Sequence, residues 1–132
     1  MRSTFSINWN RSVQTRKQRK YRHNAPLHVK SKFLHVNLDK KLREENGKSI
    51  RVKKGDTIMV MRGSAKGQTG KVERVSIKYT KIYVTGIDRQ KADGSKVLIP
   101  LEPSNLKIVE LEKRKSKKAN IGKSKKVESK ND

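Results

Sequence analysis

The sequence predicts a mainly β fold, a small five-stranded antiparallel barrel or sandwich with one short helix and basic extensions at both ends. Short apolar runs with a period of two follow one another between residues 49 and 110, and a glycine-rich loop separates the two clearest of them. Elsewhere apolar residues are too sparse for a second core, because only 31% of the residues are hydrophobic and the mean hydropathy is −0.97.

The charge divides the chain into three segments. The net charge is +23 over 132 residues, with +11 on residues 1–51, +6 on residues 52–110 and +6 on residues 111–132. We therefore expect a basic N-terminal extension (1–48), a barrel (49–110) and a lysine-rich, solvated tail (111–132). Such a charge repels itself and favours a polyanionic partner, above all nucleic acid, because binding releases condensed counterions. A membrane surface would instead require a helix with a broad apolar face, which the sequence lacks.

Several function classes are disfavoured by what the sequence lacks. It has no cysteine, so disulfides and thiol chemistry are excluded, and no apolar run approaches the roughly 18 residues of a membrane span. The first residues lack the apolar segment of a secretory signal, so we expect a cytoplasmic protein. Its three histidines, at 23, 28 and 35, have no acidic cluster nearby to form a zinc site. No serine, threonine or carboxylate has a catalytic partner, and we expect no enzyme activity, cofactor or small-molecule substrate.

The N-terminal third contains two predicted features. Residues 16–22 have a helix-compatible composition but no apolar stripe, so we expect disorder in the free chain and a helix or extended arm on a phosphate surface. Ala25-Pro26 ends any preceding helix. Residues 37–46 are predicted to form a short helix with Asn37 as the N-cap, Asn46-Gly47 as its stop, and an edge of Leu38 and Leu42 that docks on the barrel.

The strands follow in order. A lead-in strand is predicted at residues 49–52 and the best-defined strand at residues 57–62, after a turn at 54–56. The other predicted strands are 71–77, with a bend or bulge near 73–74, then 81–85, 97–99 and 106–110. Asp93-Gly94 forms a hairpin turn, and residues 103–105 form a single helical turn.

The glycine-rich loop between residues 63 and 70 resembles a phosphate-binding loop only superficially. A P-loop or a dinucleotide fingerprint would require a glycine near position 65, which is alanine, and a P-loop needs serine or threonine where Val72 stands. The loop glycines are expected to adopt positive φ angles and to let backbone N–H groups approach phosphates.

The remaining candidate chemistry is RNA binding. In the central stretch, residues 52–75, six basic residues are opposed only by Asp56 and Glu73. Any single one of the six could equally belong to the charged solvent face of a strand. The candidates there are Lys53, Lys54, Arg62, Lys66, Gly67 and Lys71, with Arg74 as a further basic residue of this stretch. The candidates of the N-terminal arm are Arg16, Lys17, Arg19, Lys20, Arg22, His28, Lys30 and Lys32. With six aromatic residues in the chain, extended base stacking is disfavoured, and contacts to the shape and backbone of folded RNA are favoured.

These residues also resemble a known family. Residues 52–72, VKKGDTIMVMRGSAKGQTGKV, resemble the KOW motif of ribosomal and transcription proteins. Together with RKQRK at 16–20, APLH at 25–28, the helix ending at Asn46-Gly47, and PSN at 103–105, they resemble the archaeal and eukaryotic form of the large-subunit ribosomal protein family called universal protein twenty-four, over residues 12 to about 110. Ser64 departs from the acidic residue usual in that family.

The resemblance implies an SH3-like barrel that binds large-subunit rRNA near the 5′ end of the 23S-type RNA. It also implies neighbouring ribosomal proteins as partners, a role in early subunit assembly, and a position near the exit of the peptide tunnel. Two alternatives stay open. A transcription-elongation module would bring an α/β domain ahead of the KOW segment. An SH3-like adaptor would need an aromatic-lined groove, for which the barrel offers only Tyr79 and Tyr83.

Overall fold

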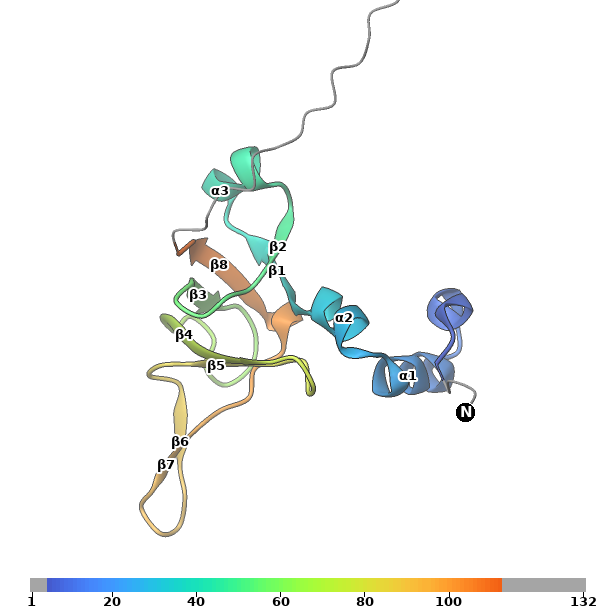
Figure 1. Ribbon diagram of the computed structural model, residues 1–132. Helices are drawn as coiled ribbons and strands as arrows, with labels where there is room; N and C mark the ends of the chain where they lie inside the picture. Colours follow the sequence, from blue (N-terminus) through green and yellow to red (C-terminus); the bar gives the residue numbers. More distant parts are fainter. Residues whose placement is uncertain (1–4, 113–132) are drawn as a thin grey trace, which may run out of the picture.

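Six strands form one mixed sheet in the order β2-β1-β8-β3-β4-β5, and a separate hairpin, β6–β7, projects from it (Figure 1). The computed structural model describes residues 5–112. The strands are β1 His35–Leu38, β2 Ser49–Arg51, β3 Thr57–Val60, β4 Thr69–Ser76, β5 Lys81–Val84, β6 Asp88–Gln90, β7 Lys96–Leu98 and β8 Leu106–Glu110. The helices are α1 Thr15–Asn24, α2 Leu27–Lys30 and α3 Lys40–Asn46, with 3-10 turns η1 Ile7–Arg11, η2 Ser31–Leu34 and η3 Pro103–Asn105.

The sheet differs from the predicted five-stranded antiparallel barrel. Strand β1 was not predicted, and it pairs in parallel with β8, with Asn37 opposite Lys107 and Leu38 opposite Ile108. Its other neighbour, β2, is antiparallel. In the described residues β2 and β5 are the two ends of the sheet, so the pairing does not close a barrel. The fold is mainly β, as predicted, while the SH3-like classification stays a prediction.

The helix predicted over residues 37–46 begins later than expected. Asn37 and Leu38 belong to β1, and α3 starts at Lys40 with Asp39 at the N-cap position. Its predicted end is confirmed, because α3 ends at Asn46 and Gly47 adopts a φ of 80° and donates its amide to the Arg43 carbonyl at 2.9 Å. The start was misjudged because a four-residue strand leads directly into a helix, and Asn and Asp are both good N-caps.

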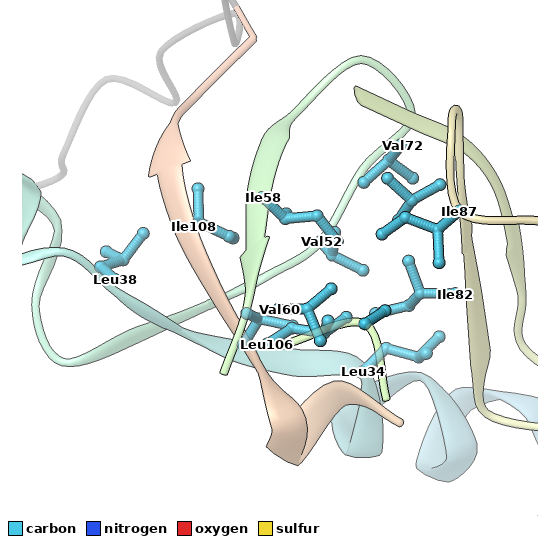
Figure 2. Packing of buried hydrophobic residues seen from close by; sticks show 13 residues of the cluster. Leu34, Leu38, Val52, Ile58, Val60, Val72, Ile82, Ile87, Leu106 and Ile108 are labelled. Atoms are coloured by element: carbon cyan, nitrogen blue, oxygen red, sulfur yellow. The ribbon is translucent and has the colours of Figure 1, made fainter. Parts of the chain in front are cut away.

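One hydrophobic core is enclosed by the curled sheet (Figure 2). Alternate residues of several strands point into it, including Ile58 and Val60 of β3 and Ile82 and Val84 of β5, all fully or almost fully buried. Val36 of β1 belongs to the same cluster. Since β1 and β5 are not neighbours in the sheet, their common core requires the sheet to bend around it. The core thus begins inside the segment that the sequence assigned to the N-terminal extension.

The predicted strand at 97–99 lies outside the main sheet. Strand β7 pairs with β6, and Val97 is 45% exposed. The predicted hairpin turn is confirmed: Gly94 has a φ of 83°, and Asp93 accepts hydrogen bonds from the backbone and hydroxyl of Ser95. The predicted bulge is also confirmed, since the β4–β5 register shifts between Val72 and Arg74.

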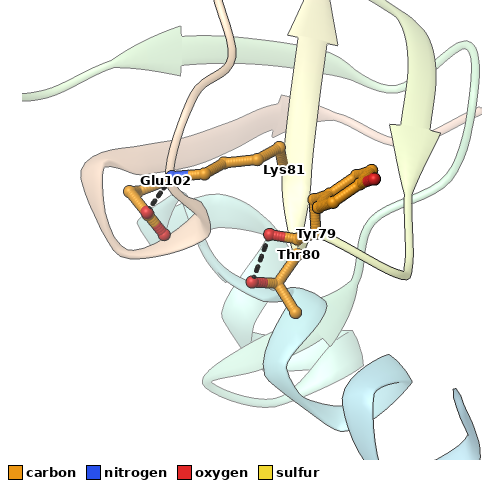
Figure 3. Close-up of polar contacts among 4 residues, drawn as sticks. All are labelled: Tyr79, Thr80, Lys81 and Glu102. Atoms are coloured by element: carbon orange, nitrogen blue, oxygen red, sulfur yellow. Dashed lines mark hydrogen bonds and ion pairs between the residues drawn. The ribbon is translucent and has the colours of Figure 1, made fainter. Parts of the chain in front are cut away.

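The β4–β5 turn is joined to the segment before β8 (Figure 3). Thr80, in the turn, has a φ of 53°, and its hydroxyl donates to the Tyr79 carbonyl at 2.7 Å. Next to it, Lys81 forms an ion pair with Glu102. Ile82 and Leu101 exchange backbone hydrogen bonds of 3.0 and 2.9 Å. These contacts hold the edge of β5 that pairs with no other strand of the sheet beside the segment that enters η3. The single helical turn of η3 matches the prediction.

Residues 15–24 form helix α1, where the sequence predicted disorder for the free chain. No residue of α1 is buried. The ring of Tyr21 lies 5.0 Å from that of Phe5 and 6.3 Å from that of Phe33, measured between centroids. The guanidinium of Arg22 lies 5.5 Å from the Phe33 ring centre. Aromatic and cation–π contacts from outside the helix therefore stabilise it in place of an apolar stripe.

The first two residues of the predicted tail, Leu111 and Glu112, are attached to the body of the protein. Leu111 is half-buried against the core, and the amide of Glu112 donates to Asp56 Oδ1 at 3.1 Å. Asp56 is fully buried and also accepts the amide of Lys53 at 2.8 Å. Residues 113–132, the rest of the predicted tail, lie outside the described residues.

An ion pair between α3 and β8 predicts a dependence of stability on pH. Lys107 Nζ donates to Asp39 Oδ1 at 3.0 Å, and this bond, followed by the backbone amide of Lys40, lowers the pKa of Asp39 below its ordinary value. A carboxyl whose pKa is lower in the folded state stabilises the fold above its unfolded-state pKa, and this contribution is lost as pH falls below about 4. The free energy of unfolding, measured by urea denaturation, should fall as the pH is lowered through this range. The fall should be shallower in Lys107→Met. Lys48→Met, which removes an exposed lysine on the α3–β2 connection, should retain the parental slope; an unchanged slope in Lys107→Met would contradict the assignment.

Candidate nucleic-acid interface

The first basic surface is the N-terminal arm, which we define as residues 5–34 and which leads away from the sheet (Figure 1). Five candidates lie on α1, and all are exposed or half-buried at most: Arg16, Lys17, Arg19, Lys20 and Arg22. The chain has no aspartate or glutamate before Asp39, so no side-chain carboxylate of the arm offsets these charges. A surface of one sign attracts a polyanion over its whole length.

The other three candidates of the arm continue this surface toward the sheet. His28 is exposed on α2, Lys30 is half-buried at its end, and Lys32 lies on η2. Val29 and Leu34 are the buried residues of these two turns. Leu34 packs in the core and fixes η2 to the body of the protein, while His28 and Lys32 remain exposed.

The second basic surface is a groove of about 740 Å³ between the end of β2, the turn after it, and β4. It brings together the predicted residues Lys53 and Lys54 with Arg51 and Arg74, opposed by Glu73 alone among its lining residues. The guanidinium of Arg74 lies 4.3 Å from the centre of the Tyr83 ring, which holds it on the sheet surface. We call this the basic groove.

Arg51 was not among the sequence candidates, and Arg74 was noted only as one basic residue of the central stretch. Arg51 ends β2 and Arg74 follows the bulge in β4, so the two are far apart in the chain. Their basic character was visible in the sequence, but their approach to Lys53 and Lys54 depends on the curl of the sheet.

The central candidates do not form one cluster. Lys71 lies opposite Thr57, at the end of β3 near Lys54. Arg62 and Lys66 lie beyond the other end of β3, in the β3–β4 loop. All three are exposed, and the four residues of β3 separate Lys71 from Arg62 and Lys66. Contact of all three with one RNA element stays a prediction.

Three amides of the β3–β4 loop donate hydrogen bonds within the protein. Gly67 donates to the Val60 carbonyl at 2.8 Å, Gln68 to Ala65 at 3.1 Å and Lys66 to Gly63 at 3.2 Å. Gly67 has a φ of 87°, as predicted for the loop, but Gly70 has no positive φ and lies in β4. The Gly67 amide is therefore engaged within the loop, and the candidate phosphate contacts there are the side chains of Arg62 and Lys66.

The described residues also bear on metal binding and on membrane-spanning helices. Within residues 5–112 no three side chains of the metal-binding types His, Cys, Asp and Glu are grouped to hold an ion. None of the helices described has the length and apolar content to cross a bilayer.

The chain is similar to known ribosomal proteins. A family model that describes ribosomal protein L26 of eukaryotes and its archaeal counterpart matches residues 12–124. The protein called large ribosomal subunit protein uL24 from Methanocorpusculum labreanum is 50% identical over 101 residues, 76% of this chain and 84% of that protein. Its namesake from Methanosarcina barkeri is 47% identical over 109 residues, 82% of this chain and 94% of that protein. The one from Methanocella arvoryzae is 45% identical over 100 residues, 76% and 81% of the two chains.

Proposed function

The chain belongs to the ribosomal protein family that comprises eukaryotic L26 and its archaeal counterparts, and from this membership we propose that it is a structural constituent of the large ribosomal subunit that binds rRNA. It acts without catalysis, in ribosomes of the cytoplasm, beside neighbouring ribosomal proteins. The observation that carries the rRNA-binding part is the arm, in which exposed basic side chains stand on α1 and no side-chain carboxylate precedes Asp39.

The two basic surfaces suit different parts of a folded RNA. The arm is narrow and extends from the sheet, so it fits between RNA helices, and its arginines can bind phosphates with two parallel hydrogen bonds (Figure 1). The basic groove is broader and lies on the body of the protein. The resemblance in sequence further supports contact with the 5′ region of the 23S-type RNA, action early in subunit assembly, and a position near the peptide tunnel exit.

The transcription-elongation alternative is less well supported. It predicts an α/β domain ahead of the KOW segment. In the described residues before β2 there are only short helices and β1, and β1 belongs to the main sheet. The relatives reported above are also named as large-subunit proteins.

Salt dependence tests the proposal directly. Affinity of the full chain for a 5′ fragment of its large-subunit rRNA should fall steeply with salt, with a log–log slope of about −5 or steeper if six or more phosphates are neutralised. The measurement is filter binding at several salt concentrations. A nearly flat slope would overturn phosphate binding by the two surfaces.

Co-sedimentation separates the two functions. The protein should stay on large subunits after a high-salt wash, at about one copy per subunit. Stoichiometric retention on RNA polymerase, with loss from washed subunits, would instead support the elongation module.

A further inference from the structure

We propose that the pocket between η1 and α1 receives a single unstacked base of the RNA. This inference deepens the proposed function, because it names the part of the RNA that one site on the arm recognises. The pocket has a volume of about 210 Å³. Its lining consists of Phe5, Ser6, Trp9, Lys17, Lys20, Tyr21 and Asn24.

Hydrogen bonds and ring contacts fix the shape of the pocket. The side-chain amide of Gln18 donates to the carbonyls of Asn10 and Ser12, at 2.9 and 2.7 Å. These two bonds join the end of η1 to α1, so that Trp9 lies over the helix. Lys17 Nζ is 4.6 Å from the centre of the Trp9 ring. On the other side, the ring of Phe5 packs on that of Tyr21.

The lining has the chemistry of a nucleobase site. Three aromatic side chains offer apolar surface to a planar ring, and stacking of this kind accepts any base because every base has a π face. Ser6 and Asn24 can exchange hydrogen bonds with the polar edge of the base. Lys17 and Lys20 provide positive charge for the phosphate attached to it. The volume is below that of a typical pocket for a whole small-molecule ligand, so it suits one base with its sugar and phosphate outside.

The position of the aromatic residues supports the same conclusion. Composition disfavoured extended stacking, since the chain has only six aromatic residues. Yet Phe5, Trp9, Tyr21 and Phe33 all lie on the arm, and Trp9 remains 49% exposed. An exposed tryptophan within a fully basic surface is well placed to bind a base beside phosphates that the lysines neutralise. Splayed bases of loops and bulges are the usual targets of such sites in RNA.

Substitution of Trp9 tests the pocket in the full 132-residue chain. Trp9→Ala should weaken binding to the rRNA fragment about tenfold or more, the loss expected for one stacked base. The log–log salt slope should stay unchanged, because no phosphate contact is removed. Trp9→Phe should retain most of the affinity. Ile7→Ala, which removes another exposed apolar residue of η1 that does not line the pocket, should bind as the parent does.

The outcomes separate this inference from the proposed function. Suppose the parent binds the rRNA fragment tightly with a steep salt slope, and Trp9→Ala has the same affinity as Ile7→Ala. The base site is then wrong, and the rRNA-binding function stands. If the parent itself shows weak, salt-independent binding, the proposed function fails first. If Trp9→Ala binds RNA normally but is lost from large subunits, the pocket receives a protein side chain, and the base site is again overturned.

A direct probe is available because Trp9 is the only tryptophan in the chain. Titration of the full 132-residue chain with adenosine 5′-monophosphate should quench the fluorescence of Trp9, with half-saturation in the millimolar range for so small a ligand. Ribose 5-phosphate carries the same phosphate without a base and should leave the fluorescence unchanged. Equal quenching by both would show a phosphate site, and no quenching by either would exclude the base pocket.

Discussion

Replacing Arg16, Arg19 and Lys20 with glutamine is expected to lower the affinity for the rRNA fragment about a hundredfold or more at 0.1 M salt. All three residues are exposed on α1, and no side-chain carboxylate of the arm competes for them. Each phosphate contact contributes close to one unit to the log–log salt slope, so the slope should become shallower by about two to three units. Glutamine retains good helix propensity, so α1 itself should persist in the variant.

A matched variant removes the same charge elsewhere. Lys40, Lys41 and Lys48 are also exposed, on α3 and the segment after it, and belong to neither basic surface. Their replacement by glutamine lowers the net charge equally, and should weaken binding only through the general field of the protein. Filter binding of both variants at several salt concentrations decides the question. Equal losses would mean that net charge, and not the arm, determines the affinity.

Gly70→Ala is expected to destabilise the fold by about 3 kcal/mol or more, the largest effect of a single methyl group that we foresee. Gly70 lies in β4 opposite Ile58. A Cβ atom there would stand 2.5 Å from the carbonyl oxygen of Thr85 and 2.7 Å from Val84 Cγ1. The oxygen belongs to the backbone beyond β5, so relief requires the β4–β5 pair to move apart, which disturbs the core beneath it. Urea denaturation measured by circular dichroism gives the change in the free energy of unfolding.

Gly63→Ala provides the comparison. Gly63 has a φ of 97°, and a Cβ atom would meet no heavy atom within 4 Å. The cost is then backbone strain alone, about 1–2 kcal/mol. If the two variants lose equal stability, the close approach of Thr85 and Val84 is not the reason for the glycine at position 70.

Much of this protein follows from local pattern. The strands β3 and β5 could be located from sequence because side chains alternate across a strand, and Ile58 with Val60 and Ile82 with Val84 obey that period. The end of α3 could be located because glycine adopts, without steric strain, the positive φ that often follows the last residue of a helix. The sign of the charge, and hence the class of partner, needed no structure, because the charge of a side chain does not depend on where the fold places it.

Other features required the tertiary structure because they depend on contacts between distant residues. The pairing of β1 with β8 joins segments about 70 residues apart, which no local period reports. The sequence groups Gly70 with the loop glycines, and only the fold brings the backbone of Thr85 beside it. The basic groove unites Arg51 with Arg74, and the arm pocket unites Trp9 with Tyr21. Sequence alone thus determined the sign of the charge and most of the strands, though not β1 or β6. The curl of the sheet and the hydrogen bonds of Gln18 decided which of the charges and rings stand together.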